Sequence, residues 1–168
     1  MNALLHWVSE LPAPLVYLVA AVIVVSETAL LPGIVFPTLS TLLLLGFLAQ
    51  RGVVNLWLAM ADVAAAAVLG DQLAYLEGRR WGPRLRETGV GRRFGEARWE
   101  RLETAVARYG LPAVMAGRCV AGVRTIMPRV AGSAAMPHRR FTLGSAMAVV
   151  PWAAAELFVG HTTATAFG

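Results

Sequence analysis

The chain has 168 residues, of which 57% are hydrophobic and only 15% are charged, and its mean hydropathy is +0.60. Soluble domains carry about 25% charged residues, so this composition excludes an ordinary soluble domain and indicates a single membrane domain over 1–168. All 15 basic residues are arginine and the net charge is +5, which in a membrane protein indicates orientation and anionic head groups rather than nucleic acid.

Several enzyme classes are excluded by the residues that the chain lacks or holds only once. Without lysine it has no Walker or Schiff-base lysine, and the single Cys119 excludes an internal disulfide and a cysteine-based zinc cluster. The three histidines do not cluster with acids in the sequence, which argues against a membrane lipid-phosphate phosphatase. We therefore expect no enzymatic activity, no cofactor and no metal, and we expect Cys119 to be a small packing residue.

The first apolar segment, 11–50, contains one charged residue, Glu27, and is about twice the ~20 residues needed to cross a bilayer. No basic residue precedes Arg51, so the start of the chain does not resemble a secretory signal peptide and is expected to be retained. The sequence LPGIVFP at 31–37 interrupts the segment, which is therefore either two crossings or one helix plus a re-entrant loop. The predicted hinge positions are Pro32, Gly33 and Pro37.

The second apolar segment, 53–76, carries Asp62 and Asp71, and the Arg-rich connection 77–110 follows it. The connection contains nine arginines and five acids, and the positive-inside bias places it in the cytoplasm. Within it, residues 95–110 have apolar side chains at helical spacing, which predicts an amphipathic surface helix. The apolar positions of that helix are Trp99, Leu102, Val106 and Tyr109.

The third apolar segment, 111–137, contains Arg118, Arg124 and Arg129. An arginine at the centre of a membrane helix costs about 2.5–3.5 kcal/mol on insertion scales, so a single crossing with three of them is disfavoured. We instead predict a re-entrant loop that enters from the cytoplasm and returns to it, followed by an exit through 141–160. The predicted hinge positions in this loop are Gly122, Pro128 and Gly132.

A broken segment followed by a span thus occurs twice, over 11–76 and 111–168, in opposite orientations. The predicted fold is an all-α polytopic membrane protein with two inverted re-entrant hairpins, each followed by a transmembrane helix. Irregular backbone at membrane depth is tolerated only against protein or water, so we expect the functional site where the two broken segments meet.

Charged residues inside the apolar segments are the candidate functional residues, because ionisable groups at membrane depth are rare and costly. Arg118, Arg124 and Arg129 are candidate substrate-binding residues, since a guanidinium binds phosphate through its planar fork. Arg118 and Arg124 converge only if the chain bends between them, and Arg129 is expected nearer the cytoplasmic surface. Glu27 and Asp71 are candidates for proton or ion coupling. The alternative is that these acids pair with the arginines and lock segments together.

The other polar residues of the spans have simpler expectations. Asp71 and Tyr75 lie one helical turn apart, so both can hydrogen-bond to a neighbouring segment. Asp62 has no motif around it and is expected to be structural. Glu156 and His161 are expected at the membrane interface.

The second half of the chain carries a specific resemblance to a known family. Residues 109–141, YGLPAVMAGRCVAGVRTIMPRVAGSAAMPHRRF, resemble the pattern of the DedA family of bacterial inner-membrane proteins, whose wider group includes the VTT-domain (SNARE-associated Golgi) proteins. The matching residues are Tyr109, Gly110, Arg118, Gly122, Arg124, Thr125, Pro128, Ala131, Gly132, Met136 and Phe141, with Trp152 after them. The sequence GDQLAYLEGRRWG at 70–82 is similar to a second family motif, and Glu27 matches the family's early glutamate.

This resemblance implies two opposed re-entrant hairpins with following helices, and it implies lipid handling. Bacterial members are linked to the recycling of undecaprenyl phosphate with dependence on the proton motive force, and eukaryotic relatives to phospholipid scrambling. The implied functional set is Glu27, Arg118 and Arg124. Leu39 stands where a second acid is usual, and Ala121 stands where a proline usually lies between the arginines. The usual further C-terminal span is not seen before the last residue, which suggests a short variant or a partner chain.

We therefore expect a multi-pass protein of the bacterial inner membrane that moves an anionic lipid, such as undecaprenyl phosphate or a phospholipid, across the bilayer with proton coupling. The alternatives are a non-transporting scaffold or regulator of envelope homeostasis, and a small-ion or proton exchanger. The expected partner is the anionic lipid, with a homo-oligomer left open and no nucleic acid.

Overall fold

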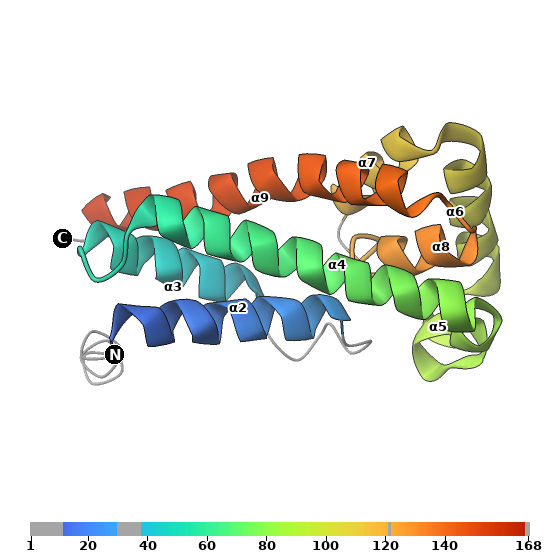
Figure 1. Cartoon of the computed structure of the whole chain (residues 1–168), viewed down its shortest axis with the longest axis horizontal. Coiled ribbons are helices and arrows are strands. Elements are labelled where there is room, and N and C mark those ends of the chain that lie inside the picture. The colour runs from blue at the N-terminus through green and yellow to red at the C-terminus, as the bar shows by residue number, and fades with distance from the viewer. Residues whose placement is uncertain (1–11, 30–37, 121, 167–168) are drawn as a thin grey trace.

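The computed structural model describes residues 12–29, 38–120 and 122–166. Over these residues the regular secondary structure is all α-helix. The helices form an elongated bundle with shorter helices across one end (Figure 1). The helices are α2 (Ala13–Ala29), α3 (Thr38–Gln50), α4 (Leu56–Glu87), α5 (Gly89–Phe94), α6 (Glu96–Tyr109), α7 (Leu111–Arg118), α8 (Met127–Ser133) and α9 (His138–Ala166). For the described residues, the predicted all-α class is confirmed.

The two longest helices contain the stretches that are long and apolar enough to cross a membrane, Leu56–Gly82 in α4 and His138–Thr163 in α9. The two helices run in opposite directions along the bundle (Figure 1). Only 33% of each stretch is buried inside the protein, although both are strongly apolar. An apolar surface of this extent on two full-length helices is typical of contact with lipid rather than water.

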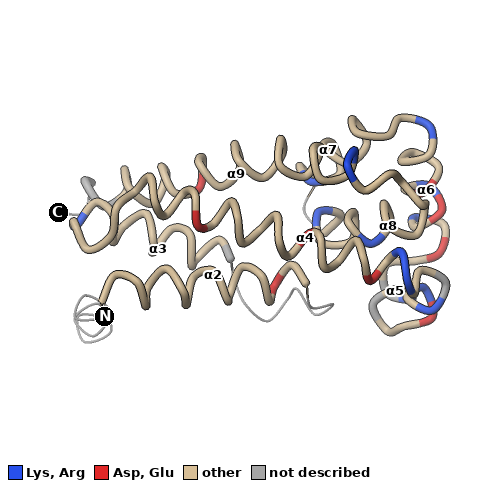
Figure 2. The backbone as a smooth tube through the Cα atoms, viewed as in Figure 1, with Lys and Arg blue, Asp and Glu red and all other residues tan. Residues whose placement is uncertain are grey.

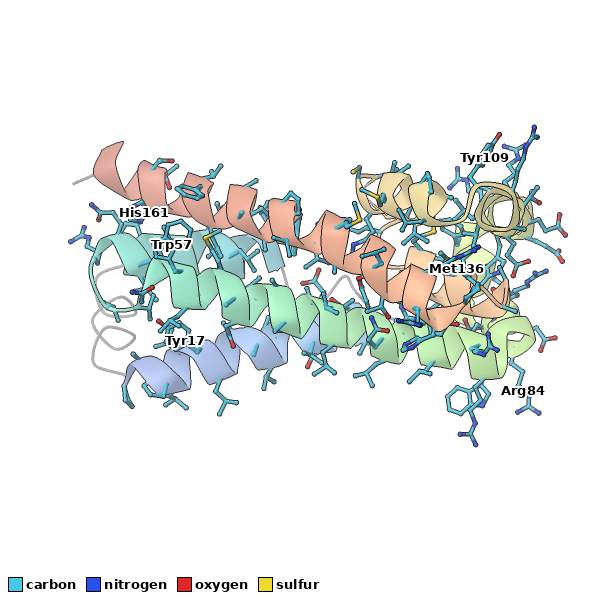
Figure 3. The ribbon with its side chains drawn as sticks, turned by 45° about the horizontal axis from the view of Figure 1, so that its top comes forward. Tyr17, Trp57, Arg84, Tyr109, Met136 and His161 are labelled. Carbon is cyan, nitrogen blue, oxygen red and sulfur yellow. The ribbon has the colours of Figure 1, made fainter. Side chains whose placement is uncertain are left out.

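Exposed aromatic side chains mark both ends of the bundle, a distribution that is typical of membrane interfaces. Trp57 is 69% exposed and lies, with His161, at the end where α4 begins (Figure 3). Arg84 and Tyr109 lie at the opposite end, beside α5 and α6 (Figure 3). Most of the arginines also gather at that opposite end, whereas charged residues are sparse along the long helices (Figure 2).

The order of two short helices and one long helix occurs twice, as α2, α3 and α4 and again as α7, α8 and α9. We call these the first and second units. In each unit, the first short helix packs on the long helix of its own unit, while the second packs mainly on the long helix of the other unit. This exchange ties the two units together, and the same packing rule holds in both directions.

Glycine residues sit at the contacts where the second short helix of one unit crosses the long helix of the other. A Cβ atom on Gly46 of α3 would collide with the backbone of α9, and one on Gly160 would collide with the backbone of α3. Gly132 of α8 and Gly78 of α4 are arranged in the same way. Both crossings therefore depend on backbones that approach more closely than any side chain permits.

The predicted hinge residues have different outcomes. The first group, Pro32, Gly33 and Pro37, lies outside the described residues. Gly122 lies in the turn between α7 and α8 with φ +80°, a backbone conformation that favours glycine. Pro128 and Gly132 are instead buried within α8, so their placement at irregular backbone was wrong. Pro128 suits the first turn of a helix, where its missing N–H is not needed, and Gly132 permits the contact with α4.

The Arg-rich connection begins as a continuation of α4 instead of a separate segment. The helix extends past residue 76 to Glu87, with a local kink at Trp81, where φ is −128° and ψ is 21°. The predicted amphipathic helix is confirmed as α6, and its Trp99 and Val106 side chains are buried. Tyr109 is 58% exposed, because α6 ends there and the chain turns at Gly110 into α7.

Glu103 of α6 connects this end of the bundle to α4 and α8. Its carboxylate accepts hydrogen bonds from Trp99 Nε1 at 2.9 Å and Ser133 Oγ at 2.6 Å, and it forms an ion pair with Arg86. Burial alone would raise the pKa of Glu103, but the hydrogen bonds and the positive charge of Arg86 together hold the pKa below its ordinary value of 4.5.

We expect this contact to weaken in acid. A carboxyl group whose pKa is lowered by folding stabilises the folded state above its unfolded pKa, and that contribution is lost as the pH falls through the folded value. The thermal unfolding midpoint in detergent should therefore fall as the pH drops below 4.5. Glu103→Gln should be less stable at neutral pH and less sensitive to acid. Glu100→Gln, at an exposed position of the same helix, should behave like wild type. An unchanged acid response in Glu103→Gln would contradict this account.

Candidate functional site

A pocket lined by Trp152, near the middle of the apolar stretch of α9, brings together the three residues Glu27, Arg118 and Arg124. Glu27 lies near the end of α2, Arg118 ends α7, and Arg124 lies in the turn that leads to α8. The other lining residues are Thr28, Ala67, Cys119, Thr125, Ala148 and Trp152. We call this the central pocket. It draws residues from both units.

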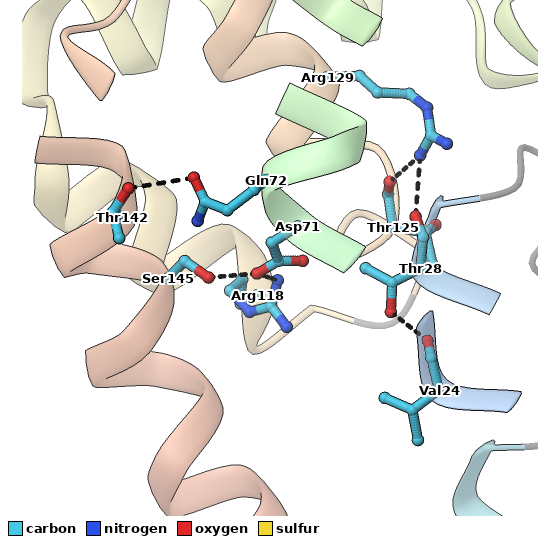
Figure 4. Close-up of polar contacts among 9 residues, drawn as sticks. All are labelled: Val24, Thr28, Asp71, Gln72, Arg118, Thr125, Arg129, Thr142 and Ser145. Atoms are coloured by element: carbon cyan, nitrogen blue, oxygen red, sulfur yellow. Dashed lines mark hydrogen bonds and ion pairs between the residues drawn. The ribbon is translucent and has the colours of Figure 1, made fainter. Parts of the chain in front are cut away.

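Arg118 and Asp71 form an ion pair on one side of the central pocket (Figure 4). Ser145 of α9 donates a hydrogen bond to the same carboxylate oxygen of Asp71. Asp71 is fully buried and the Arg118 side chain is 11% exposed, so the pair is largely shielded from solvent. Asp71 Oδ1 has no hydrogen-bond partner among the described residues. The pair therefore joins α4, α7 and α9 through one buried carboxylate.

The expectation that Asp71 and Tyr75 hydrogen-bond to neighbouring segments is confirmed. Asp71 contacts α7 and α9, while the Tyr75 hydroxyl donates to the backbone oxygen of Met136, just before α9. One face of α4 thus contacts α7, α9 and the short segment between α8 and α9.

Arg124 is held more loosely than Arg118. Its Nη2 atom lies 3.7 Å from Glu27 Oε1, a distance for an ion pair without a close hydrogen bond. The guanidinium carbon lies 5.5 Å from the centre of the Trp152 ring, within the range of a cation–π interaction. The side chain of Arg124 is 34% exposed, compared with 7% for Glu27. Arg124 is therefore the cation of the central pocket that a ligand can reach most easily.

Arg129 has a different environment from the one expected. It is 1% exposed, it does not line the central pocket, and its Nε donates to Glu77 Oε2 at 2.8 Å. Its other nitrogens donate to the backbone oxygens of Thr125 at 2.8 Å and Ala29 at 2.7 Å, with a longer contact to Thr28 (Figure 4). Its position relative to the cytoplasmic surface stays a prediction, but its side chain is buried within the protein. Arg129 instead satisfies backbone carbonyls at the end of α2, which have no partner within the helix.

Two other residues, Cys119 and Glu156, differ from their sequence-based expectations. Cys119 is exposed and lines the central pocket, so it is not a buried packing residue. Glu156 interacts with Arg124 and Glu27, which places it beside the central pocket instead of at the interface. Asp62 does not line the pocket, and its Oδ2 atom is buried without a hydrogen-bond partner among the described residues. His161 lies at one end of the bundle, as expected (Figure 3).

Sequence reasoning missed two partners of the arginines, Ser145 and Glu77. Ser145 is a small polar residue in an apolar span, a signal that is weak because serine also satisfies its own helix backbone. Glu77 lies 52 residues from Arg129 and no motif links the two. Pairs of this kind become visible only when packing brings the helices together.

The arrangement offers two guanidinium groups at one pocket, each already balanced by a carboxylate from the first unit. Arg118 is balanced by Asp71 and Arg124 by Glu27. The arginines therefore pair with acids, as the structural alternative predicted, and they also line a shared pocket, while the binding and coupling roles stay predictions. Among the described residues, no group of three or more His, Cys, Asp or Glu side chains is placed to hold a metal ion.

Comparison with known proteins identifies relatives that have similar sequences. Inner membrane protein YghB of Escherichia coli (strain K12) is 33% identical over 146 residues, which cover 87% of this chain and 67% of that protein. Inner membrane protein YghB of Salmonella typhimurium is 33% identical over 153 residues, covering 91% of this chain and 66% of that protein. Inner membrane protein YqjA of E. coli (strain K12) is 29% identical over 138 residues, covering 82% and 63%. The chain thus spans about two thirds of the length of these relatives.

No solved structure matches the chain. The VTT domain family matches residues 36–162, a range that includes α3 to α9 and most of the central pocket. The relatives are inner membrane proteins, and α4 and α9 each hold a stretch able to cross a membrane. The chain is therefore an inner-membrane protein that belongs to the VTT-domain family, in its DedA group.

Proposed function

We propose that this protein moves an anionic lipid across the inner membrane by holding its phosphate in the central pocket. The observation that carries the proposal is the meeting of Arg118 and Arg124 in one pocket about halfway along two helices that are long enough to span a bilayer. A guanidinium binds phosphate through a planar fork, and the binding is strongest where water is excluded. The proposed substrate class is a polyprenyl phosphate such as undecaprenyl phosphate, with a phospholipid as the alternative.

In this proposal, α4 and α9 cross the membrane, and the pairs α2–α3 and α7–α8 are re-entrant hairpins that enter from opposite sides. The Arg-rich end that contains α5 and α6 lies in the cytoplasm, as the positive-inside bias favours. The ends of α2 and α7 then approach each other at membrane depth, where a polar pocket between protein segments is tolerated. A phosphate in the central pocket is thereby about equally far from both surfaces.

Arg124 is the residue that exchanges between protein and lipid. It is more exposed than Arg118, and its 3.7 Å contact with Glu27 is easily replaced by a closer contact with phosphate. A proton on Glu27 favours this replacement, because a neutral carboxyl group attracts a guanidinium less than a carboxylate does. Lipid and proton thus favour the same state of the pocket, which is the requirement for coupling between them.

The test is flipping of a labelled polyprenyl phosphate by purified protein in proteoliposomes. Arg124→Gln is expected to reduce the rate by at least about tenfold, since it removes a charged hydrogen-bond donor to the phosphate, and such a bond contributes about 1.5–3 kcal/mol. Arg101→Gln removes the same charge at an exposed position of α6 and should leave the rate unchanged. A labelled phospholipid run in parallel distinguishes the two lipid classes.

Other results would remove the proposal. If folded wild-type protein flips neither lipid, with or without a pH gradient, the protein is not a transporter of these lipids, which favours a scaffold. Ion flux without any lipid dependence would instead identify a small-ion exchanger. Equal losses in Arg124→Gln and Arg101→Gln would show that net charge, and not the central pocket, determines the rate.

A further inference from the structure

We infer that Glu156 of α9, which lies beside the central pocket without lining it, acts there as a second carboxylate and shares Arg124 with Glu27. The inference rests on the proposed function for its role in transport, and it names the residue through which a proton gradient acts.

Trp152 places Glu156 next to Arg124. Glu156 follows Trp152 by one helical turn, so the two side chains lie on the same face of α9. Trp152 lines the central pocket, and its side chain lies close enough to the carboxylate of Glu156 to interact with it. The face of the same ring lies 5.5 Å from the guanidinium carbon of Arg124. One aromatic side chain thus contacts both the cation and the acid.

Glu156 also interacts electrostatically with Arg124 and Glu27, attractively with the first and repulsively with the second. Two ionised carboxylates and one guanidinium would leave the cluster with one excess negative charge in a site of low dielectric constant. A single proton shared between the two acids removes that excess, as in other coupled acid pairs. Glu156 Oε2 is buried and has no hydrogen-bond partner among the described residues, so it is a place where a proton or a water is needed.

No other acid described on the helices next to α9 is available to share Arg124 and a proton with Glu27. In its described range, α3 has no titratable side chain facing α9. On the spanning part of α4, Asp71 is engaged by Arg118 and Ser145. Asp62 has a buried oxygen without a partner among the described residues, like Glu156, but its charge shows no interaction with Arg124 or Glu27. Asp62 is therefore a matched control for the effect of an acid in a span.

The proposed sequence of events moves one proton for each lipid phosphate. With both acids ionised, Arg124 is held between Glu27 and Glu156. When one of them takes a proton, the remaining carboxylate holds Arg124 less strongly, and the guanidinium accepts the phosphate. When the phosphate leaves on the other side, Arg124 returns to the acids and the proton is released.

The first experiment measures the distribution of labelled lipid between the two leaflets of proteoliposomes. In wild type, a gradient of one pH unit should shift the distribution by up to about tenfold, which is the limit when one proton moves with each lipid phosphate. Glu156→Gln should still flip lipid but give the same distribution with and without the gradient. Asp62→Asn should respond to the gradient like wild type. A gradient response that survives in Glu156→Gln would overturn the inference.

The second experiment does not depend on transport. The five tryptophans can be replaced by 5-fluorotryptophan, and the fluorine signal of Trp152 is assigned by its loss in Trp152→Phe. This signal should move with pH in wild type and in Asp62→Asn, and should be nearly flat in Glu156→Gln. An equal pH response in Glu156→Gln would overturn the acid cluster. If wild type flips no lipid but the signal behaves as expected, the proposed function fails while the shared carboxylate site stands.

Discussion

Replacing Asp71 with alanine is expected to cost about 3–5 kcal/mol of folding free energy, because it leaves a charge buried without its partner. The Arg118 side chain is only 11% exposed, so water compensates little for the lost carboxylate. Ser145 loses its hydrogen-bond acceptor as well. The expected result is a large fall in the thermal unfolding midpoint of the purified protein in detergent.

Two further variants distinguish the destabilisation caused by the unpaired charge of Arg118 from the general effect of removing an acid from α4. Asp71→Ala combined with Arg118→Ala removes both charges and should recover part of the lost stability, because the energies of paired residues are not additive. Asp62→Ala removes an acid from the same helix but breaks no ion pair, and should cost much less. Equal losses in Asp71→Ala and Asp62→Ala would contradict the role assigned to the Arg118 pair.

The predicted acid–arginine alternatives show how far residue types determine a site. An arginine in an apolar segment needs either a counter-ion or a polar cavity, so Arg118 and Arg124 were identified from the sequence as candidates for both. The partners of Arg129 were not identified, because its acceptors include backbone oxygens at the end of α2. Any nearby donor satisfies such carbonyls, so no residue pattern predicts which one does.

The helices were predicted well where hydrophobicity determines them and less well at their ends. The apolar runs located α4 and α9, but the prediction ended the first span at residue 76 while α4 continues to Glu87. Arginine and glutamate are good helix formers, so leaving the apolar layer does not end a helix. Glu156 was expected at the interface because it lies near the end of an apolar run. The structure places it beside Arg124 because α9 continues well beyond it, to Ala166.

The origin of the charges suggests how the two units are coupled. Glu27 and Asp71 belong to the first unit, whereas Arg118 and Arg124 belong to the second. Each ion pair of the central pocket therefore crosses between units, just as each second short helix packs on the other unit. A movement of one unit against the other would change both pairs together, which links access to the pocket with its charge state.

The helix crossings that such a movement must preserve lead to the last prediction. Alanine at Gly78 is expected to destabilise the protein by more than about 1–3 kcal/mol, the usual cost of overpacking, because its Cβ would collide with the backbone of Arg129 rather than with a flexible side chain. The collision also displaces Arg129 from Glu77 and from the end of α2. Gly160→Ala should have a similar effect at the matching crossing of α9 with α3.

Gly89→Ala is the matched control, because a Cβ at that helical position meets no atom within 4 Å. It should leave the thermal unfolding midpoint unchanged or raise it, since alanine favours a helix over glycine by up to about 1 kcal/mol. If Gly78→Ala and Gly160→Ala unfold at the same temperature as Gly89→Ala, the backbones at these crossings are not in close contact. The two units would then be joined mainly by their ion pairs, and the Asp71→Ala loss would be correspondingly larger.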